Sequence, residues 1–141
     1  MKRMLENEAC FIDSNIWLYA FTDDDLQKKD IAQKLIKTTQ PVISAQVVNE
    51  VCVNLIKRAK FPELQIGELV ETFYEKYEVV EIHKGLLLSA SQLRQEYTLS
   101  YWDSIIIAAA LASDVKTLYS EDMQHGLVIR ESLQIANPFK V

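Results

Sequence analysis

The sequence predicts an α/β domain in which a parallel β-sheet is flanked by helices. Short apolar segments alternate with longer segments of helical periodicity, the pattern typical of this fold class. Glycine and proline are scarce, with three of each, which argues against long loops and flexible linkers. A chain of 141 residues without repeats or low-complexity tracts suits one domain, so we expect residues 1–141 to form a single unit.

In the first half of the chain, a short apolar run that ends at Asp13 predicts a buried strand, followed by a short helix. The run of three aspartates that ends at Asp25 offers an N-cap for a longer helix. Pro41 suits the start of a second strand, and the apolar stripe from Val48 to Ile56 predicts an amphipathic helix. The predicted elements are strands at 9–12 and 41–44 and helices at 15–21, 25–38 and 45–58.

In the second half, Pro62 suits the start of a helix, and the segment EVVEI after it predicts a third strand. Leu86, Ala90 and Leu93 then recur at helical spacing. The helix after Ser100 is apolar nearly all round and is therefore expected to be buried. Of two positions for Trp102, near the site or in the core, we favour the core. The predicted elements are helices at 62–77, 83–97 and 101–113 and strands at 78–82, 117–120, 127–129 and 133–135.

Composition and charge restrict the function classes. The formal net charge of −5 argues against a general nucleic-acid binder, but not against an enzyme that acts on nucleic acid through bound cations. No apolar stretch is long enough to cross a membrane and the N-terminus has no signal-peptide core, so we expect a soluble, cytoplasmic protein. Cys10 and Cys52 lie among apolar neighbours and are expected to be reduced core residues.

Four acids are candidates for a shared site. In a parallel sheet, ligands bind beyond the carboxyl ends of the strands, and Asp13, Asp103 and Asp122 fall at predicted strand ends or helix starts. Glu50 lies on the predicted helix 45–58, opposite its apolar stripe. Each acid also has a structural explanation: Asp13 as an N-cap, Glu50 on a solvated face, Asp103 in a capping box, and Asp122 as a loop acid with Glu121 an equal competitor.

Taken together, the four acids favour a metal site. Carboxylates that share one edge repel each other and either hold a proton or bind a divalent cation. Because no His or Cys accompanies them in these segments, their hard oxygen donors favour Mg²⁺ or Mn²⁺ over Zn²⁺. Such ions can promote phosphodiester hydrolysis.

The chain resembles PIN-domain proteins, most closely the VapC-type toxin ribonucleases. The resemblance extends from about Ala9 to Phe139 and rests on four segments in the family's order. These segments are Ile12-Asp13-Ser14-Asn15, Ser44-Ala45-Gln46-Val47 before Glu50, Tyr101-Trp102-Asp103-Ser104, and Leu118-Tyr119-Ser120-Glu121-Asp122. It implies a PIN-like parallel sheet with helices on both faces. The family's frequent additional acid after the fourth is missing, since Gln124 and His125 follow Asp122 here.

The resemblance also implies a function and its residues. Asp13, Glu50, Asp103 and Asp122 would bind Mg²⁺ or Mn²⁺ and catalyse RNA hydrolysis, with Asn15 and Ser120 supporting the site. A small antitoxin protein and a homodimer are the expected partners, and the protein would be the toxin of a type II toxin–antitoxin pair.

The basic residues after Glu50 have two interpretations. Lys57, Arg58 and Lys60 are candidates for contacts with the RNA backbone, although basic residues also suit a helix C-terminus. Two other functions remain open, a non-catalytic interaction module with this fold and an RNA-processing nuclease outside any toxin–antitoxin pair. A phosphoryl-accepting receiver domain fits poorly, because Ser14 rather than a second acid follows Asp13.

Overall fold

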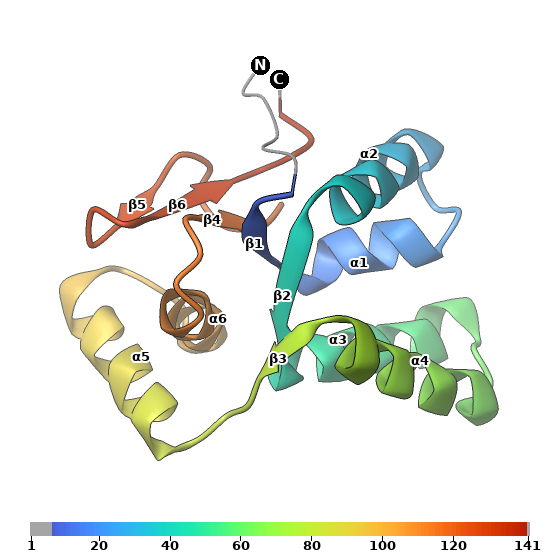
Figure 1. Ribbon diagram of the computed structural model, residues 1–141, viewed down its shortest axis with the longest axis horizontal. Helices are drawn as coiled ribbons and strands as arrows, with labels where there is room; N and C mark the ends of the chain where they lie inside the picture. Colours follow the sequence, from blue (N-terminus) through green and yellow to red (C-terminus); the bar gives the residue numbers. More distant parts are fainter. Residues whose placement is uncertain (1–6, 141) are drawn as a thin grey trace.

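A computed structural model describes residues 7–140, and its central feature is a six-stranded sheet (Figure 1). The strand order is β3-β2-β1-β4-β6-β5, and all neighbours are parallel except β5 and β6. The central strand β1 therefore has β2 on one side and β4 on the other. The strands are β1 (Ala9–Ile12), β2 (Gln40–Ser44), β3 (Glu78–Val80), β4 (Thr117–Tyr119), β5 (Val128–Ile129) and β6 (Leu133–Ala136).

Six helices cover the sheet within the described residues. In Figure 1, α1 to α4 lie on one side of the central strands β1 and β2, and α5 and α6 lie on the other. The predicted α/β fold with helices on both faces is thereby confirmed. The helices are α1 (Ser14–Phe21), α2 (Leu26–Thr38), α3 (Ala45–Ala59), α4 (Glu63–Lys76), α5 (Lys84–Glu96) and α6 (Tyr101–Ala112).

The predicted elements are all present, with ends that differ by one or two residues, and side-chain caps and strand pairing explain the differences. The third strand stops at Val80 rather than Ile82, because Val80 pairs with Ser44, the last residue of β2. The predicted helix 83–97 begins one residue later, since His83 is its N-cap and its Nδ1 accepts a hydrogen bond from the Leu86 N–H. Pro62 likewise precedes its helix as the N-cap.

The core lies between the sheet and the two helical layers. Phe11, Ile12 and Leu118 from the central strands are fully buried, as is Ile107 from α6. Trp17 of α1 is also buried, and its indole N–H donates to the carbonyl oxygen of Ile12, directly before Asp13. The core therefore anchors the end of the central strand where the first candidate acid begins.

Two further expectations concern the whole chain. Cys10 and Cys52 are free thiols in the core, as predicted. Among the helices in residues 7–140, none combines the length and apolar character that a membrane crossing requires. The predicted single domain also includes residues 1–6 and 141, which lie outside the described part of the chain.

Candidate functional site

The candidate site lies at the edge of the sheet where the parallel strands β2, β1 and β4 end. Asp13 directly follows β1, Ser44 ends β2, and Ser120 directly follows β4. The strands are neighbours in register, and the Asp13 N–H donates to the carbonyl oxygen of Tyr119 at 3.0 Å. Because parallel strands present their carboxyl ends at one edge, the sheet gathers these segments from distant parts of the sequence.

Asp13 is a buried acid held in one orientation. Its residue is 6% exposed, and it is the N-cap of α1. Oδ1 accepts a hydrogen bond from the Ser14 N–H at 2.8 Å, and Oδ2 accepts one from the Ser120 hydroxyl, also at 2.8 Å. Asp13 can therefore be both the N-cap of α1 and a residue of the candidate site, since its carboxylate caps the helix and lies at the edge of the sheet where ligands bind.

Electrostatics make the charged form of Asp13 costly. Burial raises the pKa of Asp13 from 3.8 to about 6, and hydrogen bonds from Ser120 and Ser14 only partly oppose this shift. The nearby carboxylates of Glu50 and Asp103 raise the pKa further. Three of the four predicted acids thus lie close enough to interact electrostatically, and a cation would relieve their repulsion.

The first two turns of α3 supply the second acid. The Ser44 hydroxyl caps this helix by accepting a hydrogen bond from the Val47 N–H at 3.3 Å. Gln46 and Glu50 follow one turn apart, on the same face of the helix. Burial raises the pKa of Glu50, the Ser14 and Gln46 side chains lower it, and the Asp103 carboxylate raises it. Glu50 therefore belongs to the acid group rather than to a solvated face.

The start of α6 brings in the third acid. The Ser100 hydroxyl accepts a hydrogen bond from the Asp103 N–H at 3.1 Å, which confirms the predicted N-cap. The Gln46 side-chain amide donates to the carbonyl oxygen of Trp102 at 3.4 Å, and this contact joins the first turns of α3 and α6. This contact between α3 and α6 therefore holds Asp103 near Glu50.

Unpartnered oxygens at this edge fit a cation. Three buried side-chain atoms in the described residues have no hydrogen-bond partner, namely Asn15 Oδ1, Gln46 Oε1 and Glu50 Oε1. All three are oxygen acceptors, and all belong to the α1 and α3 segments that supply Asp13 and Glu50. A buried acceptor without a donor is costly, and Mg²⁺ and Mn²⁺ bind such oxygen atoms. The donor set thus suits a hard divalent cation.

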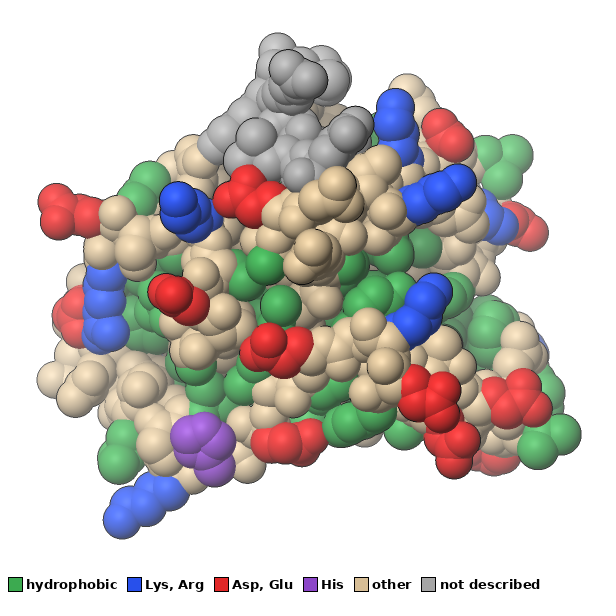
Figure 2. All heavy atoms as spheres, viewed as in Figure 1, with side chains coloured by type: hydrophobic (Ala, Val, Ile, Leu, Met, Phe, Trp, Pro, Cys, Tyr) green, Lys and Arg blue, Asp and Glu red, His purple; other side chains and the backbone are tan. Residues whose placement is uncertain are grey.

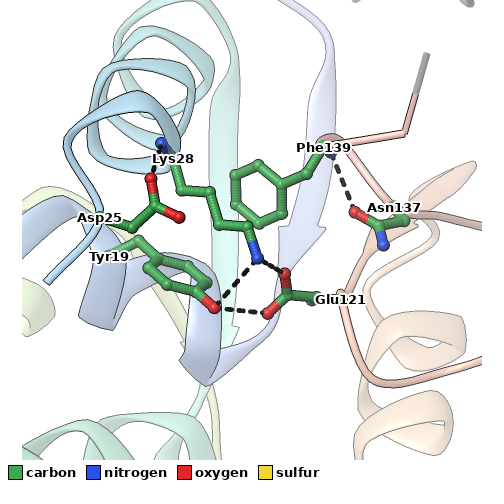
Figure 3. A network of polar contacts seen from close by, with 6 residues as sticks. All are labelled: Tyr19, Asp25, Lys28, Glu121, Asn137 and Phe139. Atoms are coloured by element: carbon green, nitrogen blue, oxygen red, sulfur yellow. Dashed lines mark hydrogen bonds and ion pairs between the residues drawn. The ribbon is translucent and has the colours of Figure 1, made fainter.

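The fourth predicted acid lies in the loop after β4, next to Glu121, whose contacts Figure 3 shows. Asp122 is exposed in the loop after β4, and none of the electrostatic shifts of Asp13 and Glu50 involves it. Its neighbour Glu121 forms an ion pair with Lys28 of α2 and accepts a hydrogen bond from the Tyr19 hydroxyl at 2.7 Å. Since Lys28 and Tyr19 already engage Glu121, Asp122 is the acid of this loop that remains available to a ligand.

The acids do not form a finished coordination sphere. Within residues 7–140, no three Asp, Glu, His or Cys side chains converge closely enough to hold one ion in this arrangement. Asp13 lies near Glu50 and Asp103, and Asp122 is exposed in the loop two residues after Ser120. An ion held by all four acids would therefore require their side chains to rearrange.

The predicted RNA-contacting residues lie away from the acids. Lys57, Arg58 and Lys60 are exposed at the C-terminal end of α3, and Lys60 is its C-cap with a positive φ of 59°. Seven to ten residues of helix separate them from Glu50, or roughly 10–15 Å. On the face shown in Figure 2, basic side chains stand apart rather than in one patch. Their role in RNA binding remains a prediction.

A groove at the opposite edge of the sheet, where the strands begin, is separate from the acids. Its volume is about 800 Å³, and the starts of β1, β2 and β3 line it together with Trp17 and Phe21 of α1. Because the acids follow the carboxyl ends of the strands and this groove meets their amino ends, the groove is not part of the candidate site.

Sequence reasoning missed several residues at the site. Ser14 and Gln46 both influence the Glu50 carboxylate. Gln46 was recognisable only by its position one helical turn before Glu50. Trp102 was expected in the core, but this expectation was wrong: it is 62% exposed, because it occupies the first turn of α6, whose buried residues begin at Ser104.

The fold and the site define an α/β protein with carboxylates beyond the carboxyl ends of its parallel strands. The PIN domain family model matches residues 10–127, most of the chain. The chain therefore belongs to the PIN domain family. No curated protein sequence matches it.

Several solved structures share this fold. A toxin–antitoxin complex from Klebsiella pneumoniae has a TM-score of 0.69 at 19% identity, covering 94% of this chain and 99% of that one. The Mycobacterium tuberculosis toxin VapC20, described as cleaving the sarcin–ricin loop, has a TM-score of 0.64 at 18% identity. The match covers 80% of this chain and 89% of VapC20. VapBC2 from Rickettsia felis, bound to promoter DNA, has a TM-score of 0.61 at 20% identity. The match covers 92% of this chain and 98% of that one. At these identities the likeness concerns the fold.

Proposed function

We propose that this protein is a Mg²⁺- or Mn²⁺-dependent ribonuclease that hydrolyses RNA phosphodiester bonds. One observation carries the proposal: Asp13 is buried beside Glu50 and Asp103 at the carboxyl-end edge of the sheet. Buried carboxylates that repel one another are stable in their charged form only with a compensating cation. The unpartnered oxygen of Glu50 supports the same conclusion.

Each acid has a proposed role. Asp13, Asp103 and Asp122 would hold the ion, and Glu50 would be a further ligand or would position the attacking water. A divalent cation in such a site stabilises charge on the phosphate oxygens and favours ionisation of water. Ser120 and the Ser14 N–H keep the Asp13 carboxylate oriented, and Asn15 supports the site with its amide oxygen. Lys57, Arg58 and Lys60 would contact the RNA backbone farther along α3.

The biological role that we propose is the toxin of a type II toxin–antitoxin pair. The Klebsiella pneumoniae structure is a toxin–antitoxin complex, VapC20 is described as a toxin that cleaves the sarcin–ricin loop, and VapBC2 from Rickettsia felis is bound to promoter DNA. By analogy, this protein would act in the cytoplasm, form a homodimer and pair with a small antitoxin. An RNA-processing nuclease outside such a pair would use the same acids.

Cleavage of a single-stranded RNA by the purified protein tests the activity. We expect cleavage with Mn²⁺ or Mg²⁺, none with EDTA, and none by Asp13→Asn in either condition. Asp30→Asn, which changes an exposed acid on α2, is the matched control and should cleave as the wild type does. Cleavage by Asp13→Asn at the wild-type rate would refute the active-site assignment, and titration with Mn²⁺ without heat of binding would favour an inert interaction module.

Growth of bacteria that express the chain tests the toxin role. We expect expression to arrest growth and Asp13→Asn to relieve the arrest. Co-expression of the adjacent upstream reading frame, if it encodes a small DNA-binding protein, should restore growth of the wild-type strain. A nuclease that is active in vitro but harmless in the cell would favour the RNA-processing role instead.

A further inference from the structure

Two aromatic side chains are exposed at the start of α6, the helix that carries Asp103. Tyr101 is 52% exposed and Trp102 is 62% exposed. Their ring centroids are 5.3 Å apart in an edge-to-face arrangement. Two adjacent exposed rings offer a flat apolar surface to a ligand.

An arginine lies against this aromatic pair. The Arg94 guanidinium of α5 is 4.4 Å from the centroid of the Tyr101 ring. It also donates a hydrogen bond of 2.6 Å to the Ser104 hydroxyl, which in turn donates to the Tyr101 carbonyl oxygen at 2.5 Å. No carboxylate among residues 7–140 forms an ion pair with Arg94. Its positive charge is thus held in place and remains available to an anion.

The aromatic pair adjoins the candidate active site through the backbone. Trp102 directly precedes Asp103, and its carbonyl oxygen accepts the hydrogen bond from Gln46 that joins α6 to the helix of Glu50. The two rings also sit in the first turn of a twelve-residue helix, whose positive end favours an anion nearby. A ligand on the Trp102 ring would therefore be held one residue away from Asp103 on α6.

We infer that Tyr101, Trp102 and Arg94 form a subsite that binds one nucleotide of a single-stranded nucleic acid, with its base stacked on the rings and its phosphate near the guanidinium. This inference rests on the proposed nuclease function. Flat apolar rings beside a guanidinium that forms no ion pair in residues 7–140 match a base and its phosphate. Because the chain carries a net charge of −5, stacking would provide affinity that general attraction to phosphate does not.

Tryptophan fluorescence can measure this binding without catalysis. The chain has two tryptophans, and Trp17 is buried, so a stacked base would quench mainly Trp102. In EDTA, titration with a single-stranded hexaadenylate should quench the wild-type signal, and Trp102→Phe should lose the quench. An otherwise identical hexamer with abasic sites should bind the wild type more weakly, on the order of tenfold, the loss expected for one stacked base.

Variants separate stacking from folding and from charge. Binding of a labelled hexaadenylate, followed by anisotropy, should weaken on the order of tenfold in Trp102→Ala and stay unchanged in Tyr74→Ala, which removes an exposed ring on α4. Partial retention of affinity by Trp102→Phe would indicate stacking, and equal melting temperatures would exclude misfolding. Arg94→Gln should reduce the slope of log affinity against log salt by about 0.7, the value for one phosphate contact on a single strand.

The outcomes distinguish this inference from the proposed function. Equal affinity of wild type and Trp102→Ala for the hexamer would overturn the subsite, even if metal-dependent RNA cleavage is observed. Loss of a dimer in Trp102→Ala by sedimentation, with unchanged oligonucleotide binding, would identify the rings as a protein interface and would also overturn it. Conversely, if the hexamer quenches the Trp102 fluorescence but the protein cleaves no RNA, the proposed subsite is supported and the proposed nuclease activity is refuted.

Discussion

The Ser120 hydroxyl donates a hydrogen bond to Oδ2 of Asp13 across 107 positions of sequence. The two residues meet because β1 and β4 are parallel neighbours, and each residue directly follows its strand. Ser120 is fully buried, and its oxygen also accepts a hydrogen bond from the Met123 N–H at 3.3 Å. One hydroxyl therefore orients the buried carboxylate and shapes the loop that carries Asp122.

Removal of this hydroxyl should weaken metal binding more than folding. In Ser120→Ala, Asp13 loses a hydrogen-bond donor and the Met123 N–H loses its acceptor. We expect Mn²⁺ affinity to fall about 10- to 100-fold in calorimetric titration, the usual effect of losing a residue that orients a ligand. Unfolding free energy should fall by about 1–2 kcal/mol at pH 7. Ser113→Ala, which removes a hydroxyl bound to Ala110 at the end of α6, should keep wild-type Mn²⁺ affinity.

The raised pKa of Asp13 should make stability depend on pH in the metal-free protein. Burial raises the pKa to about 6, so between about pH 4 and pH 6 the folded state binds more protons than the unfolded state. Unfolding free energy should therefore decrease as pH rises through this window, by on the order of 3 kcal/mol for Asp13. Glu50, whose pKa is also raised by burial, contributes with the same sign.

Asp13→Asn isolates the contribution of this carboxyl. Since the amide cannot ionise, urea unfolding at several pH values should show a flatter profile and greater stability than the wild type at pH 7. Asp30→Asn should keep the wild-type profile. An Asp13→Asn profile as steep as that of the wild type would mean that another group causes the dependence.

The ion pair of Lys28 and Glu121 should position the loop after β4. Lys28 also lies 4.9 Å from the Tyr19 ring centroid and 5.3 Å from that of Phe139, so the pair connects α2 to the loop and to the C-terminal segment (Figure 3). Lys28→Met should lower Mn²⁺ affinity several-fold through Asp122, with at most about 1 kcal/mol of lost stability, because the pair is partly exposed. Lys29→Met breaks the exposed pair with Asp23 and should leave Mn²⁺ affinity unchanged.

Asp122 and Glu121 should differ in their effects on cleavage. Asp122→Asn removes the available acid and should lower cleavage at saturating RNA at least 100-fold, with partial recovery at high Mn²⁺ concentration. Glu121→Gln keeps a hydrogen-bond acceptor for Tyr19 and should lower cleavage less than tenfold. The reverse order of severity would show that Glu121 is the ligand and that its contact with Lys28 gives way when metal binds.

Much of the architecture follows from local sequence patterns. Apolar runs such as the one before Asp13 form buried strands, and the stripe from Val48 to Leu55 forms the buried face of α3. The rule that parallel strands present their ends at one edge then places Asp13 and Ser120 together. These features depend on the periodicity of side chains along short segments, so a single sequence contains them.

The sequence by itself determined the α/β class, the order of the elements and the segments that carry the four acids, because periodicity and capping act over a few residues. Only the tertiary structure decided that Glu121 pairs with Lys28, 93 positions away, that Trp102 is exposed, and that Asp122 is exposed in the loop after β4. Such outcomes depend on how α2, α6 and the loop after β4 pack around the sheet. Contacts between distant segments leave no periodic trace in a single sequence.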